Sequence, residues 1–493
     1  MRLHLDYETK SELDLKEVGI FLYANHPSTR VIMASWSFNY GPVKQWDSES
    51  GEPIPQELLD AIENDEIEKW AFNAAFERMI SKHVLKLKTN IRSWFCTMVL
   101  AYSQSFMGTL EMISKQMGNS EDKQKSKDGK RLIRLFCGPQ KPTAKNPWVW
   151  RDGMTDPEDW YSFLAYNKQD VVTERDGLYK KLIKYPMPPE EWELYHIDQE
   201  INDRGIPIDR TFVANAITLC DRVKAEMFEL MVELTGLSNP NSPTQLLGWI
   251  QERGYPFSDL RKETVEKVLR ENEEGSVTYN YETKRLEPDP QMLTDDCVKA
   301  LKMRQASART SVMKYNAIVQ RLSSDDRIHH AFQFGGASRT QRWAGRGVQV
   351  HNLPRTPKYL EPEDIYAERL EDVTEIIRQN DYGMLKLYVS DPLDALAGTV
   401  RSSIQAPEGM ELRVCDLSSI ENVSLGALAD CQRILNIFRE GRDPYKDFGT
   451  DFYNVPYEEV TKLQRTNSKP AVLGAGYRLG GGEMRDGKKT GLW

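Results

Sequence analysis

The 493-residue sequence lacks any apolar run of the length that a membrane helix needs. Such a helix takes about 18 or more consecutive apolar residues, and no stretch approaches that length. The N-terminus begins at once with strand-like residues and has neither the basic start nor the apolar run of a signal peptide. We therefore expect a soluble, cytoplasmic protein without a membrane partner.

Cysteine and histidine are scarce. The six cysteines are scattered without a Cys-x-x-Cys pair, which excludes a zinc ribbon, offers no disulfide framework and favours reduced thiols. None of the seven histidines forms an i, i+4 pair that could hold a metal from one helix. Carboxylates must therefore hold any metal, and oxygen ligands favour Mg²⁺ or Mn²⁺.

Positive charge is also in deficit: the net charge is −9, which at first sight argues against a nucleic-acid partner. Yet residues 298–321 hold six basic side chains and no acidic one, residues 335–358 hold five and no acidic one, and residues 123–151 are mainly basic. One such run is most simply a solvated face, but three in an acidic protein favour a surface that follows nucleic-acid phosphates. Lys302 and Arg309 of the first run are candidate contacts.

Length and pattern predict several domains. A chain of 493 residues is expected to form two to four of them. The prolines at 186, 188 and 189 predict the first boundary, because proline interrupts a helix. Strands near 2–8 and 30–38 are expected before this break, in an alternating α/β pattern. After the break, residues 190–325 are expected to be rich in helices, and residues 326–360, which are rich in glycine and arginine, are expected to form strands and loops. One strand is expected over 411–417, and helices are expected after it.

Carboxylates and a tyrosine in the first region predict a metal-dependent active site. The residues from 2 to 9 alternate like a strand, so Asp6 and Glu8 project from one face. Glu77 opens a predicted helix, and Tyr166 and Asp170 lie four residues apart on one helix face. Two divalent ions held by such carboxylates can cleave a phosphodiester, while the phenol orients or helps to deprotonate the attacking water. Taken alone, Asp6 and Glu8 would most simply be an exposed polar strand face.

Three short motifs follow one another along this region: Asp6-x-Glu8, Asn73-x3-Glu77 and Tyr166-x3-Asp170. Their order resembles that of the DEDD exonucleases, tyrosine subtype, over residues 1–185. The resemblance implies an RNase H-like domain that removes nucleotides from 3′ ends. It also implies that Asp6, Glu8 and Asp170 are metal ligands and that Glu77 and Tyr166 complete the catalytic set. Glu77 stands where most members have aspartate, which leaves its role open.

Two segments between residues 336 and 421 resemble parts of the palm domain of the family A DNA polymerases. The first runs from Gly336 to Arg342 and on to His351-Asn352-Leu353-Pro354. The resemblance implies that Arg342 and Asn352 contact DNA, with Arg342 at the minor-groove edge of the primer terminus, where acceptors are shared by all base pairs. A basic loop on phosphates is the alternative.

The second palm segment, Val414 to Glu421, is similar to polymerase motif A, and Asp416 is expected at the end of the apolar strand 411–417. It implies that Asp416, helped by the Leu417 carbonyl, binds two magnesium ions. Glu421 would stand where bulk excludes a ribose 2′-OH. Without the family, Asp416 would pass for an ordinary aspartate at a strand end.

A third polymerase-like segment resembles motif B of the fingers domain of the family A DNA polymerases. Its members recur every four residues, which predicts one helix face: Arg465, Lys469, Leu473 and Tyr477. The resemblance implies that Arg465 and Lys469 grip the triphosphate of an incoming nucleotide. Leu473 and Tyr477 would flank the new base pair, and Leu473 replaces the usual aromatic residue.

Together, the resemblances imply a multidomain α/β (α+β) protein. An RNase H-like exonuclease domain would precede a helical thumb, a partial palm and partial fingers of a right-hand polymerase, over residues 1–185, 190–325, 326–430 and 431–493. The expected partners are primer-template DNA and dNTPs. The expected cofactors are two Mg²⁺ or Mn²⁺ ions in each active site, and a phage-encoded protein would act in the host cytoplasm.

The later palm motif of the family, usually His-Asp-Glu, does not occur in the sequence. Asp416 alone would hold two ions poorly, so we expect these 493 residues to degrade DNA without extending a primer. Two explanations are a fragment of a longer protein and a split polymerase whose palm a second chain completes. A stand-alone exonuclease and a non-catalytic primer-template-binding subunit are the alternative functions.

Overall fold

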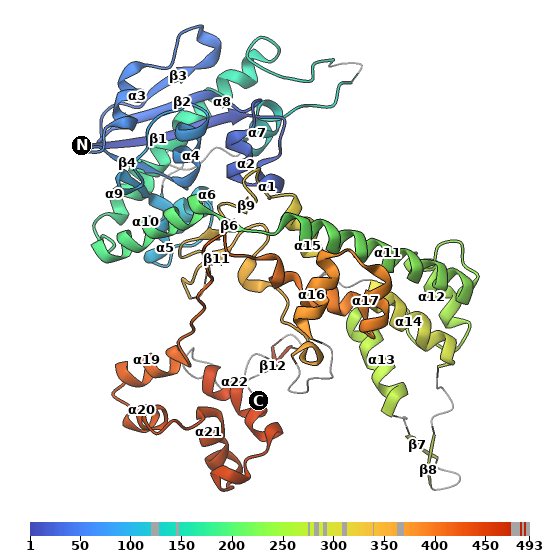
Figure 1. Cartoon of the computed structure of the whole chain (residues 1–493). Coiled ribbons are helices and arrows are strands. Elements are labelled where there is room, and N and C mark those ends of the chain that lie inside the picture. The colour runs from blue at the N-terminus through green and yellow to red at the C-terminus, as the bar shows by residue number, and fades with distance from the viewer. Residues whose placement is uncertain are drawn as a thin grey trace. The chain divides into compact units, whose positions relative to one another are not determined.

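The computed structural model divides the chain into two compact units, Met1–Gly409 and Met410–Trp493 (Figure 1). The boundary between the units falls within the range predicted for the palm, 326–430, and the four domain ranges remain predictions. The structure describes these residues: 1–119, 128–143, 147–274, 277–280, 285–288, 293–307, 313–338, 340–361, 369–474, 484–485 and 488–489.

A mixed five-stranded sheet in the first unit has the order β3-β2-β1-β4-β5. β1 is its centre, antiparallel to β2 and parallel to β4. Leu3, Leu5 and Tyr7 of β1 are buried in the largest apolar core, and the intervening residues face the opposite side. The strands predicted near 2–8 and 30–38 are confirmed. The strand bounds are β1 Arg2–Lys10, β2 Arg30–Phe38, β3 Lys44–Asp47, β4 Glu68–Ala71 and β5 Trp94–Cys96.

Helices cover this sheet, and α8 packs on both β1 and β2 while α4 packs on β1. α8 continues into a π-helical stretch, η4, and then into α9, which ends at Leu182. The helix predicted to carry Tyr166 and Asp170 is confirmed, and the helical stretch ends before Pro186 as the prolines predict. The bounds are α1 Leu15–Val18, α2 Ile20–Asn25, η1 Ser48–Ser50, α3 Gln56–Glu63, α4 Ala75–His83, η2 Ile91–Ser93, α5 Thr97–Ser103, α6 Leu110–Gln116, α7 Gly129–Phe136, α8 Pro157–Val172, η4 Thr173–Tyr179 and α9 Lys180–Leu182.

The long helix α11 organises the remainder of the first unit and packs against α14, α15, α16 and α18. Asp209 caps its start by accepting from the Phe212 N–H, and Gly236 ends it at φ +68°. The predicted helix-rich region 190–325 and the short strands of 326–360 are confirmed. The bounds are α10 Pro189–Arg204, β6 Ile206–Pro207, α11 Arg210–Thr235, α12 Pro243–Gln251, α13 Lys262–Glu274, β7 Val277–Asn280, β8 Arg285–Pro288, α14 Asp295–Ser307, α15 Met313–Val319, β9 Arg327–Ile328, β10 Phe332–Gln333, β11 Ala344–Gly345, η6 Val350–Asn352, η7 Lys358–Leu360, α16 Leu370–Arg378, α17 Tyr382–Tyr388, α18 Pro392–Gly398 and η8 Val400–Ser403.

The second unit is mainly helical, and the strand predicted over 411–417 is wrong. Val414 and Leu417 are 92% and 71% exposed, and this segment is extended without a strand partner. A strand needs a hydrogen-bonded neighbour, and the described residues of this unit contain only the short hairpin β12-β13. The bounds are α19 Ile420–Leu428, α20 Gln432–Arg439, α21 Pro444–Tyr453, η9 Tyr457–Glu459, α22 Lys462–Gly474, β12 Met484–Arg485 and β13 Lys488–Lys489.

A buried ion pair joins α4 of the sheet region to α10, which follows the proline break. The Arg78 guanidinium donates to both carboxylate oxygens of Asp203, at 2.8 and 2.7 Å, and the Arg78 side chain is 1% exposed. Burial alone would raise the pKa of Asp203, but hydrogen bonds from Arg78 and His330 outweigh burial and hold that pKa well below its ordinary value of 3.8. The pair therefore stabilises the fold when Asp203 is ionised.

Replacing Arg78 by methionine (Arg78→Met) is expected to lower the free energy of unfolding at neutral pH by about 3 kcal/mol, because it leaves a buried carboxylate without its main partner. A lowered folded-state pKa stabilises the fold above the unfolded pKa, here close to 3.8, and this contribution is lost as the pH falls through the folded value. The deficit of the variant should therefore shrink below about pH 4. Urea unfolding at neutral and acidic pH measures both effects.

Arg2→Met is the matched control for this prediction. Arg2 pairs with Glu68 at 2.8 Å, but the two side chains are 42% and 41% exposed. Losing this pair should change the free energy of unfolding by less than about 1 kcal/mol. Equal losses in the two variants would show that the Arg78–Asp203 pair is no stronger than a surface contact.

Candidate active site

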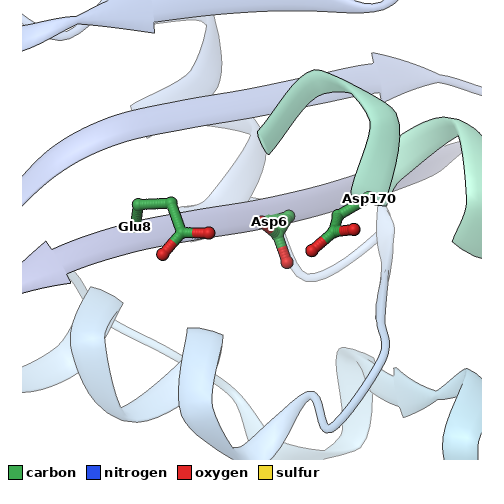
Figure 2. Close-up of side chains that lie close together, drawn as sticks. All are labelled: Asp6, Glu8 and Asp170. Atoms are coloured by element: carbon green, nitrogen blue, oxygen red, sulfur yellow. The ribbon is translucent and has the colours of Figure 1, made fainter. Parts of the chain in front are cut away.

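Three of the predicted catalytic carboxylates meet beside the central strand (Figure 2). Asp6 and Glu8 project from one face of β1, and Asp170 reaches them from α8. One oxygen from each of these side chains lies within 4.8 Å of the others. Glu8 and Asp170 are 9% and 4% exposed, so two of these charges are largely removed from water. The three oxygens can act together on one bound group.

Asn167 fixes the orientation of Asp6. Its side-chain amide donates to Asp6 Oδ2 at 2.7 Å, and Ser35 donates to its carbonyl oxygen at 2.5 Å. Asn167 is fully buried and lies three residues before Asp170 on the same helix. No role was predicted for it, although its spacing from Asp170 was an available signal, since residues three apart share a helix face.

Glu77 is buried near this cluster but is not one of the three grouped ligands. It lies in α4 and is 3% exposed, and its Oε2 has no hydrogen-bond partner among the described residues. Burial and then the charge of Asp6 raise its pKa well above the ordinary value of 4.5. Glu77 therefore lies close enough to the cluster for the charge of Asp6 to act on it.

Tyr166 borders the cluster one helical turn before Asp170. Burial, followed by the charges of Asp170 and Glu8, raises the pKa of its phenol far above the ordinary value of 10. The ring lies so close to α7 that a Cβ on Gly129 would come within 2.1 Å of its Cε2. The phenol therefore lies where it can orient, or help to deprotonate, a water in the site.

A thiol also touches the cluster. Cys137 Sγ lies 3.9 Å from Glu8 Oε2, and burial and then the charge of Glu8 raise the pKa of the thiol well above 9. The protonated thiol can donate weakly to Glu8. Nothing in the local sequence links these two residues, because 129 positions separate them.

The predicted DNA contacts of the first unit lie on exposed positions. Lys302 is exposed on α14, Arg342 is exposed in a loop, and Asn352 is exposed at the end of η6. Arg309, predicted beside Lys302, lies outside the described residues. Of the described side chains, Lys302, Arg342 and Asn352 are not part of the carboxylate cluster.

The predicted motif A residues of the second unit surround the start of α19. Asp416 and Leu417 lie in the exposed extended segment, and Glu421 is half-buried in the first turn of the helix. The expectation that Asp416 ends an apolar strand is wrong, because no strand forms there. Asp416 belongs to none of the groups of three possible metal-ligating side chains found among the described residues.

Two of the predicted motif B residues, Arg465 and Lys469, lie on one face of α22, as their four-residue spacing predicts. The Arg465 guanidinium and the Lys469 ammonium lie 5.1 and 5.7 Å from the centre of the same ring, that of Tyr445. Arg465 also donates to Asp443 at 2.6 Å. Leu473, on the same helix, is 41% exposed, and Tyr477 lies outside the described residues.

Comparison with known proteins identifies the family. The DNA polymerase of Bacillus phage SP02 is 34% identical over 486 residues, which span 98% of this chain and 70% of the phage protein. The chain belongs to the family A DNA polymerases, as its motifs predict. No family model matches the sequence.

The fold is similar to that of a solved polymerase structure. The POL domain of Pol1 from M. smegmatis, in complex with DNA primer-template and dNTP, matches 96% of this chain and 67% of its own length. The TM-score is 0.53 at 13% sequence identity, so the likeness concerns the fold.

None of the helices in the described ranges is both long and apolar enough to cross a bilayer.

Proposed function

We propose that residues 1–185 form a 3′→5′ exonuclease that proofreads the DNA made by this polymerase. The observation that carries the proposal is the convergence of oxygens from Asp6, Glu8 and Asp170 within 4.8 Å in mostly buried surroundings. Charges of one sign at such a distance repel strongly unless a cation neutralises them. Three carboxylates with only oxygen donors fit Mg²⁺ or Mn²⁺.

The residues of the site divide the chemistry among them. Asp6, Glu8 and Asp170 would hold two divalent ions, which supply an activated water and neutralise the leaving oxygen in phosphodiester cleavage. Asn167 keeps Asp6 turned toward the cluster through its 2.7 Å hydrogen bond. The Tyr166 phenol would orient the attacking water or donate to a phosphate oxygen, and Glu77 Oε2, which has no hydrogen-bond partner among the described residues, would accept from a water in the site.

The remainder of the chain would bind primer-template DNA and a dNTP, the ligands of the structural neighbour. Lys302, Arg342 and Asn352 are exposed and can reach DNA. Arg465 and Lys469 present two cations on one helix face, which suits a triphosphate. Asp416 and the Leu417 carbonyl would hold magnesium for synthesis.

Replacing both β1 carboxylates (Asp6→Ala with Glu8→Ala) should abolish degradation of a labelled single-stranded 3′ end. The loss is expected to exceed about 1,000-fold, since removing the metal ligands removes the activated water. Primer-template binding should remain, because the predicted DNA contacts lie elsewhere. Asp416→Ala is the control and should degrade the strand at the parental rate. Parental degradation by the double variant would refute the proposed exonuclease.

Asp443→Asn is expected to tighten dNTP binding by about threefold, which corresponds to releasing Arg465 from an ion pair worth ~0.6 kcal/mol. Asparagine can still cap α21, as Asp443 does by accepting from the Tyr445 and Lys446 N–H groups. Arg465→Ala should weaken binding. Equilibrium titration of a labelled dNTP onto the protein–primer-template complex measures these changes.

Asp451→Asn provides the matched control for the nucleotide prediction. Asp451 also pairs with an arginine of the same unit, Arg433, but neither side chain was predicted to touch the nucleotide. Its replacement should leave the dNTP affinity unchanged. If Asp443→Asn binds no more tightly than this control, Arg465 is not a triphosphate ligand.

A further inference from the structure

A second buried polar group lies beside the carboxylate cluster, between the same two elements. The His4 Nδ1–H donates to Glu174 Oε2 at 2.7 Å, and the Thr97 hydroxyl donates to the other Glu174 oxygen. These three residues are 0%, 3% and 0% exposed. Among the described residues, Glu174 has no lysine or arginine partner, so these two donors hold its carboxylate in place.

The group is in register with the predicted metal ligands. His4 and Asp6 are two apart on β1, and Glu174 and Asp170 are four apart on the helix that packs against it. Two residues of a strand advance by about 6.7 Å and four residues of a helix by about 6 Å, so successive same-face positions stay matched. Each side chain on this face of β1 therefore faces one side chain of the helix, and we call each such pair a step. His4–Glu174 is one step, and Asp6–Asp170 is the next.

The third step supports this arrangement. Glu8 is the next same-face residue of β1, and Tyr166 precedes Asp170 by four positions. Glu8 and Tyr166 therefore occupy the next same-face position on β1 and on α8. β1 and the helix thus run past each other in opposite directions, with one side chain from each element at every step.

Hydrogen bonds and ring packing hold the His4–Glu174 pair in place. Its hydrogen bonds tie the helix to β1 and, through Thr97, to the start of α5. The His4 ring also packs edge-on against Tyr179 of η4, with ring centres 4.8 Å apart. Glu174 lies at the beginning of the π-helical η4, a departure from α-helix that often accompanies a functional site.

We propose that His4, Glu174 and Thr97 are positioning residues that fix the separation of Asp6 from Asp170 and so set the affinity of the exonuclease site for divalent cations. This inference rests on the proposed exonuclease function. Side chains that hold metal ligands in place commonly change metal affinity when they are replaced, although they never touch the ion.

Manganese binding to the full chain tests the proposal. His4→Phe keeps a ring against Tyr179 and removes the N–H donor, whereas His4→Asn restores an N–H close to the position of Nδ1. Electron paramagnetic resonance measures Mn²⁺ binding, and the component removed by Asp6→Ala with Glu8→Ala belongs to this site. We expect His4→Phe to weaken this component by about tenfold and His4→Asn to bind within about threefold of the parent.

Exonuclease kinetics give a second readout. The Mn²⁺ concentration for half-maximal degradation should rise about tenfold in His4→Phe, while the KM for the oligonucleotide stays unchanged. His196→Phe is the control, because His196 is also buried and its Nε2 contacts the Trp94 carbonyl at 3.0 Å. It should lose stability without any change in Mn²⁺ affinity.

The outcomes separate the two proposals. Parental Mn²⁺ affinity in a folded His4→Phe variant, or equal weakening in His4→Phe and His4→Asn, would overturn the positioning role. If His4→Phe does not fold, Thr97→Val removes only the second donor and should weaken Mn²⁺ binding by about threefold; unchanged binding would again overturn it. Mn²⁺ binding that depends on His4 in a parent without nuclease activity would support the positioning role and overturn the exonuclease proposal instead.

Discussion

Carboxylates that share a buried place repel one another, and the sheet region of the first unit is arranged around such a group. Asp6, Glu8 and Asp170 offer oxygens within 4.8 Å of one another, and Glu77 lies close enough for Asp6 to raise its pKa. This arrangement is costly in the absence of a cation, so the surrounding fold must hold it together. The apolar face of β1 and the packing of α8 across β1 and β2 supply that rigidity.

Buried polar contacts extend this rigidity in two directions. The hydrogen bond from Asn167 holds Asp6, while His4 and Thr97 hold Glu174 one step along the same helix. On the other side, α4 carries Glu77 and, next to it, Arg78, whose ion pair reaches α10 beyond the proline break. A site that tolerates little movement is therefore connected to the first helix of the range predicted for the thumb, residues 190–325.

Local periodicity accounts for what the sequence could predict. The alternation along β1 and the four-residue spacing of Tyr166 and Asp170 placed the site residues on the correct faces. Both patterns follow from the backbone geometry of a strand, with two residues per repeat, and of a helix, with about 3.6 residues per turn. Contacts between distant segments carry no such signal: Asn167 reaches Asp6 across 161 positions. The strand expected over 411–417 failed for a related reason, because a strand depends on a partner that its own residues do not encode. The prediction that the chain is a DNA polymerase came from the resemblance of its motifs to a family, because composition and a net charge of −9 would not have suggested it.

The central claim is that Asp6, Glu8 and Asp170 hold divalent cations together. Diffraction data collected at the manganese absorption edge, from crystals soaked in Mn²⁺ with a short single-stranded oligonucleotide, test it most directly. The account predicts anomalous density in contact with all three carboxylates, and its disappearance in crystals of the variant with Asp6→Ala and Glu8→Ala. Manganese that binds elsewhere in the crystal and leaves this cluster empty would contradict it.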